Sequence, residues 1–410
     1  MKLCLVTESY SPRVDGVAIS VRTLESGLRS RTADRPDVVV LAPTSREFGR
    51  CSTSSRYRWV RTPYDGYPLP LLTLGRLRRF LHQLEPDLVH LETQGVLGVL
   101  TMMACSELGI PVVTTFHTDL VGYSGSYRTA PLLGALAASI ASASTEVFRR
   151  LGMPRTVHEP TTMVRLVIEW ICGESAAVIA PSQKMQGVLA RDGCIATAVI
   201  PTPRQLSATK VSPGGGHTVA QLPNASKYFC YVGRLSREKT ISYLFEAFFR
   251  AFGHQSDVYL VMAGSGSVRS ELQSLARKVG IGPRVRFTGV LSEDEVAALM
   301  SDAVALVQPS LTDTQCLAMW EAASLGTPCV IRDPALTGRG SPIEDELTCL
   351  VGTSLDTFSG ALERLVADPL TRTGLGDRAK ERARAERYSL DHFVERHLAI
   401  YSRVPQPNGR

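Results

Sequence analysis

Short apolar stretches alternate with helical patterns along most of the chain, and this alternation limits the fold more than any other feature. In the first half, strands are predicted at Lys2–Thr7, Asp37–Leu41, Asp87–Leu91, Val112–Phe116, Ala176–Ala180 and Ala198–Ile200. Helices are predicted at Val17–Leu28, Gly95–Leu108 and 183–191. Short apolar strands that alternate with helices form parallel sheets covered on both faces. We therefore expect a doubly wound α/β domain.

The second half repeats the pattern. Strands are predicted at Tyr228–Val232, Val258–Ala263, Val285–Thr288, Ala303–Gln308 and Cys329–Ile331, and helices at Thr240–Phe252, Val268–Val279, Glu293–Met300 and Leu317–Leu325. A chain of 410 residues is too long for one core and suits two domains of about 200 residues each. We expect domains at 1–203 and 227–385, a linker rich in Ser, Pro and Gly at 204–226, and a further helix within 386–410.

Two carboxylates, Asp313 and Glu321, stand eight positions apart near the end of this pattern. Glu321 is the only charge in the predicted helix Leu317–Leu325. A carboxylate in apolar surroundings is costly unless hydrogen bonds are donated to it, and sugar hydroxyls are suitable donors. Thr312 or Asp313 is expected to cap the helix, whose free amides suit a phosphate. The alternative is a capping Asp and a helix Glu that faces solvent, and this segment alone does not decide between the two.

A second motif, Gly233, Arg234 and Lys239, follows the strand predicted at Tyr228–Val232. Glycine lets the backbone turn sharply beside a ligand. Two cations at this point can neutralise a diphosphate, and they stabilise a transition state in which its negative charge grows. The alternative, two surface cations beside a helix start, is weaker because cations near a helix N-terminus oppose its dipole.

Other candidate positions also follow predicted strands. Gly264 and Gly266 form a Gly-x-Gly turn, which is weak evidence alone because most such turns are only tight turns. Gly16 opens a helix after the first strand and lets its N-terminus approach a phosphate. His117 follows the strand at Val112–Phe116, where an isolated histidine usually makes a structural hydrogen bond.

In their order along the chain, these segments resemble the GT-B glycosyltransferases of family 4. Asp313 and Glu321 match the family's nucleotide-sugar motif, Gly233 to Lys239 its Gly-Arg-x-x-x-x-Lys motif, and His117 its Tyr-His-Thr motif. The resemblance covers roughly residues 1–400 and is greatest to bacterial diacylglycerol glucosyltransferases and α-mannosyltransferases. It implies a GT-B fold, with two tandem Rossmann-like domains, an interdomain cleft, and a C-terminal helix that crosses back onto the first domain.

The resemblance also implies a function. A retaining glycosyltransferase would move a hexose from a UDP- or GDP-linked sugar to a hydroxyl of a lipid, a sugar or a specialised metabolite. Asp313 would hold sugar hydroxyls, Glu321 the ribose, Arg234 and Lys239 the diphosphate, and His117 the sugar from the opposite wall. The other donor-binding positions would be Gly16, Gly233, Gly264, Gly266, Val290, Cys316 and Leu317, and the acceptor would lie against Tyr123 and Tyr127.

Several positions depart from the family's pattern. Arg204, Cys316 and Cys349 stand where relatives usually carry Gly, and Asp313 is one methylene shorter than the usual Glu. A side chain at position 316 could crowd a phosphate or a sugar. A catalytically impaired partner protein that binds sugar nucleotides is therefore an alternative. A phosphorylase or an epimerase on the same fold is another, because a fold does not fix the chemistry.

Metal ions and further cofactors are not expected, because the sequence has no Asp-x-Asp and its eight histidines form no ligand cluster. Nine cysteines without paired spacing indicate a reduced, cytoplasmic protein. We expect no export signal, because the sequence enters a predicted strand directly. It contains no apolar run of the roughly 20 residues that span a bilayer.

Six arginines and one acid lie between Arg56 and Arg79. Residues 74–84 read as an amphipathic helix, with Arg76, Arg78 and Arg79 opposed to leucines. This basic face could make a peripheral contact with the inner face of the membrane. A solvated helix packed on its own sheet is the favoured alternative, since exposed aromatic residues are lacking. Nucleic acid is not an expected partner, because no recognition module appears.

Overall fold

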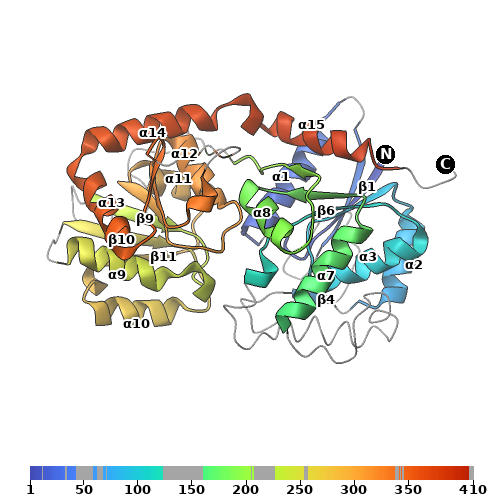
Figure 1. The fold of residues 1–410 in the computed structure, drawn as a ribbon, viewed down its shortest axis with the longest axis horizontal. Helices are drawn as coiled ribbons and strands as arrows, with labels where there is room; N and C mark the ends of the chain where they lie inside the picture. The colour runs from blue at the N-terminus through green and yellow to red at the C-terminus, as the bar shows by residue number, and fades with distance from the viewer. Residues whose placement is uncertain are drawn as a thin grey trace. The chain divides into compact units, whose positions relative to one another are not determined.

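The computed structural model describes residues 1–11, 13–32, 35–42, 59–61, 68–70, 72–122, 160–204, 206, 227–253, 257–337, 341, 343 and 346–405. The chain divides into two compact units (Figure 1). The first comprises Met1–Thr202 and Leu390–Arg410, and the second comprises Pro203–Ser389. Arg204, which the sequence prediction places in the linker, thus belongs to the second unit.

The first unit is built on a parallel six-stranded sheet in the order β2-β1-β5-β6-β7-β8. Its strands are β1 Lys2–Val6, β2 Asp37–Leu41, β5 Leu88–Leu91, β6 Val112–Thr115, β7 Ala177–Ala180 and β8 Ala198–Val199. Each was predicted to within two residues at either end. A separate antiparallel pair is formed by β3 Trp59–Arg61 and β4 Pro68–Pro70.

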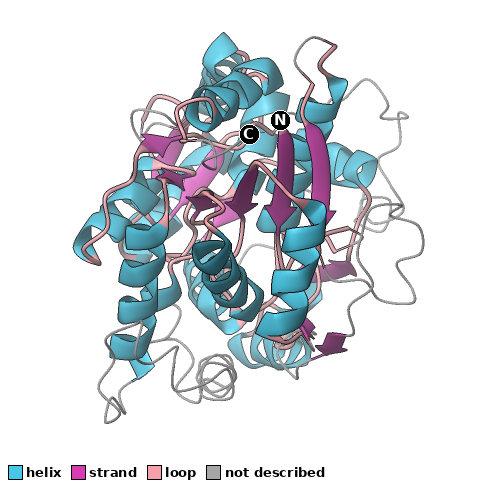
Figure 2. Ribbon diagram, turned by 90° about the vertical axis from the view of Figure 1, so that its right-hand side faces the viewer, coloured by secondary structure: helices cyan, strands magenta, loops and turns pink. Residues whose placement is uncertain are grey.

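Helices lie on both sides of this sheet (Figure 2). They are α1 Gly16–Ser30, α2 Leu74–Leu84, α3 Val96–Leu108, α7 Pro160–Glu174, α8 Gln183–Arg191 and α15 Leu390–Tyr401. One core contains residues of α2, α3, α7 and α8, and the other contains residues of α1 and α15. The last helix of the chain therefore completes the first unit, where it packs against α1.

Helix α2 has the amphipathic character that the sequence predicts. Leu77 and Leu81 are buried in the core of the first unit, whereas Arg76, Arg78 and Arg79 are exposed. The Arg78 guanidinium lies 3.2 Å from the carboxylate of Glu107 on α3. The apolar side of the helix is thus used within the unit, and the contact of its basic side with lipid stays a prediction. None of the helices in the described ranges is long and apolar enough to cross a membrane.

The second unit has its own parallel sheet, in the order β11-β10-β9-β12-β13-β14. Its strands are β9 Lys227–Val232, β10 Val258–Ala263, β11 Val285–Gly289, β12 Ala305–Gln308, β13 Cys329–Ile331 and β14 Cys349–Val351. The helices are α9 Ile241–Phe252, α10 Arg269–Val279, α11 Glu293–Ser301, α12 Leu317–Leu325, α13 Leu355–Ala367 and α14 Pro369–Ala383. Strand β14 and helices α13 and α14 were not predicted from the sequence.

The strand order of the second sheet reverses between β9 and β12. From β9 the chain adds β10 and β11 on one side, and from β12 it adds β13 and β14 on the other. Open parallel sheets bind ligands outside the carboxyl ends of their strands at such a reversal. Gly233 directly follows β9, and Pro309 directly follows β12. The fold therefore brings the motif of Gly233, Arg234 and Lys239 close to the motif that contains Asp313.

Two helices of the second unit meet so closely that only glycine fits between them. A Cβ added at Gly376 of α14 would lie 2.0 Å from the carbonyl oxygen of Gly326, the residue that ends α12. Replacing Gly376 with Ala should therefore lower the free energy of unfolding by about 2 kcal/mol, because backbone must move to make room. Urea unfolding measures the change.

The matched control is Gly360, which lies in α13 and has no atom within 4 Å of an added Cβ. Its replacement by Ala should leave the protein as stable or up to about 1 kcal/mol more stable, through helix propensity alone. Equal effects of the two substitutions would contradict the proposed packing constraint.

Candidate functional site

An ion pair between Lys239 and Asp313 lies at the strand reversal of the second sheet. The ammonium of Lys239 donates a hydrogen bond to the Asp313 carboxylate, and both side chains are largely buried, at 11% and 13% exposure. The Thr240 hydroxyl donates to the carbonyl of Pro309 at 2.7 Å. The loop that follows β9 is thus joined to the loop that follows β12.

Arg234 is oriented from beneath by a buried carboxylate. Its guanidinium lies 3.3 Å from Glu238, whose side chain is fully buried. The hydroxyl of Ser236 donates to the same Glu238 oxygen, and the Tyr231 hydroxyl donates to the Arg234 carbonyl at 2.8 Å. The guanidinium remains about one third exposed. Glu238 therefore fixes the orientation of the Arg234 guanidinium, while part of the guanidinium faces solvent.

Gly264 and Gly266 have a packing role in this structure. A Cβ at Gly264 would lie 1.9 Å from the carbonyl oxygen of Gly233, and one at Gly266 would lie 2.1 Å from that of Leu235. Backbone hydrogen bonds join the same loops, including one of 3.0 Å from the Gly233 amide to the Ala263 carbonyl. These contacts account for both glycines, and their contact with a ligand stays a prediction. Val290, beyond β11, is exposed.

The expected cap of α12 is wrong. The residue before the helix is Cys316, which has a φ of 56° and makes no side-chain capping hydrogen bond. Asp313 lies three residues earlier and pairs with Lys239 instead, while Leu317 is the first helical residue. The left-handed conformation costs a non-glycine residue about 1–2 kcal/mol. Gln308 donates a hydrogen bond to the Cys316 sulfur at 2.9 Å.

Cys316 is a neutral thiol under ordinary conditions. Burial, together with the negative charge of Asp313, raises the pKa of this thiol to about 12. It therefore adds volume beside the Lys239–Asp313 pair without adding charge.

Glu321 is buried within α12, so the alternative of a solvent-facing Glu is wrong. Its Oε1 accepts a hydrogen bond of 2.6 Å from Nε of Arg204. Burial raises the pKa of Glu321, and the positive charge of Arg204 opposes that rise. In the sequence Arg204 stood out only as a departure from glycine. Its pairing with Glu321, which joins residues 117 positions apart, was not predicted.

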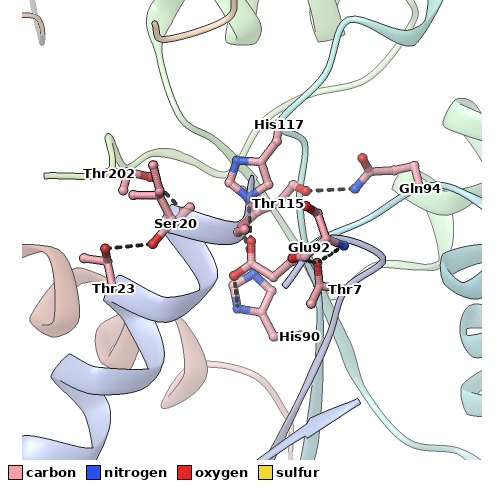
Figure 3. A network of polar contacts seen from close by, with 12 residues as sticks. Thr7, Ser20, Thr23, His90, Glu92, Gln94, Thr115, His117 and Thr202 are labelled. Atoms are coloured by element: carbon pink, nitrogen blue, oxygen red, sulfur yellow. Dashed lines mark hydrogen bonds and ion pairs between the residues drawn. The ribbon is translucent and has the colours of Figure 1, made fainter. Parts of the chain in front are cut away.

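In the first unit, His117 is held by the carboxylate of Glu92, which was not predicted as a site residue (Figure 3). Its Nε2 lies 2.6 Å from Oε2 of Glu92, which follows β5 and is buried. His90 lies on the other side of Glu92, with Nδ1 at 3.6 Å from Oε1. Burial acts to raise the pKa of Glu92, but the neighbouring histidines outweigh it and lower the pKa to about 2. Glu92 is therefore a fixed negative charge, and it fixes which nitrogen of His117 points away from it.

The network continues to the C-terminal helix of the first unit. His90 bonds to the Tyr401 hydroxyl of α15 at 2.7 Å and to the Thr115 hydroxyl at 2.8 Å. His397, also on α15, is buried and bonds to the Phe393 carbonyl at 2.8 Å. The orientation of His117 thus depends on groups from β5, β6 and α15.

The start of α1 is occupied by the protein's own carboxylate. Asp15 caps the helix by accepting from the Ala18 amide at 2.9 Å, and it also accepts from Ser9 and Arg13. Although burial opposes it, these hydrogen bonds lower the pKa of Asp15. Gly16, the first helical residue, is exposed. The predicted acceptor residues Tyr123 and Tyr127 lie outside the described residues.

The predicted site residues therefore fall into two sets. Gly16 and His117 belong to the first unit. The second unit contains Gly233, Arg234, Lys239, Gly264, Gly266, Val290, Asp313, Cys316, Leu317 and Glu321. Among the residues that the structure describes, no group of three or more His, Cys, Asp or Glu side chains is placed to hold a metal ion.

Two family models match consecutive parts of the chain. Residues 14–207 match the model described as Glycosyltransferase Family 4, and residues 217–382 match the model described as Glycosyl transferases group 1. Together the two models extend over most of the sequence.

Curated relatives are similar over most of their length. A GDP-mannose-dependent alpha-mannosyltransferase of Mycolicibacterium smegmatis is 27% identical over an alignment of 419 positions, which covers 98% of each chain. The protein of that name from Corynebacterium glutamicum is 28% identical over 80% of this chain and 72% of its own. An alpha-monoglucosyldiacylglycerol synthase of Streptococcus pneumoniae is 24% identical over 90% of this chain and 79% of its own.

Solved structures share the fold at lower identity. Alr3699/HepE of Anabaena, in complex with UDP-glucose, aligns with a TM-score of 0.71 at 17% identity and covers 98% of this chain and 99% of its own. Sucrose-phosphate synthase of Thermosynechococcus elongatus aligns with a TM-score of 0.71 at 19% identity and covers 98% of each chain. The GT-B fold implied by the sequence motifs is confirmed.

The buried histidines predict a loss of stability in acid. Burial and the neighbouring His90 lower the pKa of His397 from 6.5 to about 3. Below pH 6.5 the unfolded chain therefore binds a proton that the folded protein excludes, so the free energy of unfolding should fall by about 1.4 kcal/mol per pH unit for this group. Urea unfolding at pH 7, 6 and 5 measures the slope.

Replacing His397 with Gln should reduce this slope, whereas replacing His82, which is exposed on α2, should leave it unchanged. The same slope in the His397 variant as in the unaltered protein would contradict the prediction.

Proposed function

Because the chain belongs to the family 4 glycosyltransferases of the GT-B fold, we propose that it is a retaining hexosyltransferase that takes its sugar from a UDP- or GDP-linked donor. The observation that carries this proposal is the Lys239–Asp313 pair at the strand reversal of the second sheet. A cation and a carboxylate side by side match the two parts of such a donor, its diphosphate and its sugar hydroxyls. The named relatives support both a guanine and a uracil nucleotide as candidates.

In this proposal Arg234 and Lys239 bind the diphosphate. The bond between the sugar's anomeric carbon and the phosphate oxygen breaks, and the negative charge of the diphosphate grows. Cations already in place stabilise that charge more in the transition state than in the ground state. They would take the part that a divalent cation has in other transferases, so no metal ion is required.

Asp313 and His117 would hold the sugar. When a diphosphate shares the Lys239 ammonium, the Asp313 carboxylate can accept hydrogen bonds from sugar hydroxyls. Glu92 binds Nε2 of His117, so a hydrogen bond from His117 to the sugar would be made through Nδ1. The acceptor hydroxyl would attack the anomeric carbon from the face that the diphosphate leaves, and its proton would pass to the departing phosphate oxygen.

The acceptor is proposed to be a lipid, a sugar or a specialised metabolite that offers a hydroxyl group. The alpha-monoglucosyldiacylglycerol synthase among the relatives supports a lipid acceptor. The names of the mannosyltransferases specify no acceptor, so a sugar and a specialised metabolite stay candidates.

A second candidate function is a sugar-nucleotide-binding partner protein with impaired catalysis. Two observations favour it. Cys316 has a strained backbone conformation beside the Lys239–Asp313 pair, and Arg204 donates a hydrogen bond to the Glu321 carboxylate. Donor binding without transfer to any acceptor and without slow donor hydrolysis would support this candidate.

The two cations of the site should be essential for turnover. Replacing Arg234 or Lys239 with Ala should lower kcat by a hundredfold or more, if each cation supplies about 3 kcal/mol of transition-state stabilisation. Arg237 is the matched control, since it lies in the same loop but is exposed and pairs with Glu271. Its replacement by Ala should leave kcat within about twofold, as expected for a surface ion pair.

Release of nucleoside diphosphate from the donor measures these rates, with and without excess EDTA. Retained turnover in both the Arg234 and Lys239 variants would reject the assignment, and loss of turnover in EDTA would reject metal independence.

Retention of the anomeric configuration is tested separately from turnover. The new glycosidic bond should have the anomeric configuration of the donor, because attack and departure take place on the same face of the sugar. Proton NMR of the product shows the configuration through the coupling of the anomeric proton for glucosyl products, or through the carbon–proton coupling of the anomeric carbon for mannosyl products. A product with inverted configuration would exclude the proposed mechanism.

A further inference from the structure

Two thiols of the first unit, those of Cys172 and Cys194, lie against each other. Cys172 is on α7 and is partly exposed, whereas Cys194 follows α8 and is buried at 2% exposure. Both belong to one apolar core, where Cys172 packs at the margin. The Cys172 thiol donates a hydrogen bond to the Cys194 sulfur, and both cysteines are free. The two sulfurs are therefore neighbours, although β7 and α8 separate them in the sequence.

The backbone near both cysteines favours this contact. The Cys194 thiol donates to the carbonyl oxygen of Ile168 on α7 at 3.7 Å. Ile168 lies one helical turn before Cys172, and side chains on a helix lean toward the preceding turn. The Cys172 side chain therefore leans toward the place where the Cys194 sulfur lies. The Cys194 amide donates to the Leu189 carbonyl at 2.8 Å, which ties this cysteine to the end of α8.

An ion pair joins the same turn of the chain to α7. Arg165 of α7 lies 3.3 Å from the carboxylate of Asp192, which is buried. Gly193, between Asp192 and Cys194, has a φ of 79°, a conformation that glycine adopts without strain. The turn 192–194 is thus held on α7 before any covalent bond joins the two.

We propose that Cys172 and Cys194 form an oxidation site, at which hydrogen peroxide joins the two sulfurs in a disulfide. Peroxide oxidises one thiol to a sulfenic acid and is itself reduced, with the release of one water. The second thiol attacks that sulfur and the S–S bond forms, while the sulfenic oxygen leaves as a second water with the thiol proton. Two thiols and one peroxide thus give one disulfide and two waters. A dithiol reductant restores the thiols.

Exposure distinguishes this pair from two other pairs of neighbouring cysteines in the described ranges. Cys4 and Cys105 interact in the core of the first unit, and both have 0% exposure. Cys329 and Cys349 lie opposite each other on β13 and β14, also at 0% exposure. Oxidation of a thiol requires access from solvent. Of these three pairs, the one that contains Cys172 has that access.

Mass spectrometry of the full-length protein tests the proposal. The folded protein is treated with a small excess of hydrogen peroxide, its remaining thiols are capped with N-ethylmaleimide, and it is digested with trypsin without reduction. Trypsin places the two cysteines in separate peptides, residues 166–184 and 192–204, with one cysteine in each. We expect these peptides joined, lighter by two hydrogen atoms than their sum, and released by dithiothreitol.

The bond should also stabilise the protein. A disulfide that fits the native geometry removes conformational freedom from the unfolded chain, and the expected rise in Tm is about 5 °C. Differential scanning calorimetry of the oxidised and the reduced protein measures this shift. Cys172→Ser replaces a partly exposed thiol and is the control, which should give neither the joined peptides nor the shift after the same treatment.

The absence of the joined peptides from the folded, oxidised protein would overturn the proposal, as would joining that takes place only after unfolding in urea. Equal oxidation of Cys4 and Cys105 would overturn it as well, because exposure would then not select the site. A lower Tm in the oxidised protein would show that the folded chain does not accommodate the bond, which would also overturn it.

Discussion

A buried charge must be paired inside the protein, and this constraint shapes both parts of the candidate site. Parallel strands deliver their carboxyl ends to one edge of a sheet, and the charged side chains there lie close to an apolar core. A lone buried charge is strongly destabilising, and breaking a buried pair by removing one partner costs about 3–5 kcal/mol. Lys239 is paired with Asp313, Arg204 with Glu321, and His117 with Glu92.

The two ion pairs of the second unit differ in how the surrounding chain holds them. Asp313 and Lys239 bridge two loops at the strand reversal, and each matches a chemical group of a nucleoside diphosphate sugar. The chain next to Arg204 is anchored to α12, because the Leu206 amide donates a hydrogen bond to the Ser324 hydroxyl. This contact holds Arg204 near Glu321 on the same helix. The candidate site of the second unit therefore contains one pair that bridges two loops, Lys239–Asp313, and one pair that is anchored to α12, Arg204–Glu321. Cys316 adds volume beside the Lys239–Asp313 pair in a strained conformation.

Local patterns predicted most of the fold but not the pairings. The strands Val258–Ala263 and Cys329–Ile331 were predicted to the residue, because continuous apolar runs mark buried parallel strands. Helix α14 was missed, since its buried face consists largely of Gly and Ala and gives a weak apolar period. The cap of α12 was wrong because Asp313 is drawn to Lys239, 74 positions away in sequence, and no local rule contains that contact. The pairings of Glu92 with His117 and of Arg204 with Glu321 were not predicted for the same reason.

The central claim is that the Lys239–Asp313 pair binds the donor, with the diphosphate on Lys239 and the sugar on Asp313. A crystal structure of the protein with bound UDP-glucose or GDP-mannose tests it most directly. The account predicts diphosphate oxygens within hydrogen-bonding distance of the Lys239 ammonium and the Arg234 guanidinium, with a sugar hydroxyl bonded to the Asp313 carboxylate. A diphosphate bound elsewhere, with the Lys239–Asp313 pair unchanged and out of contact with the nucleotide, would contradict the account.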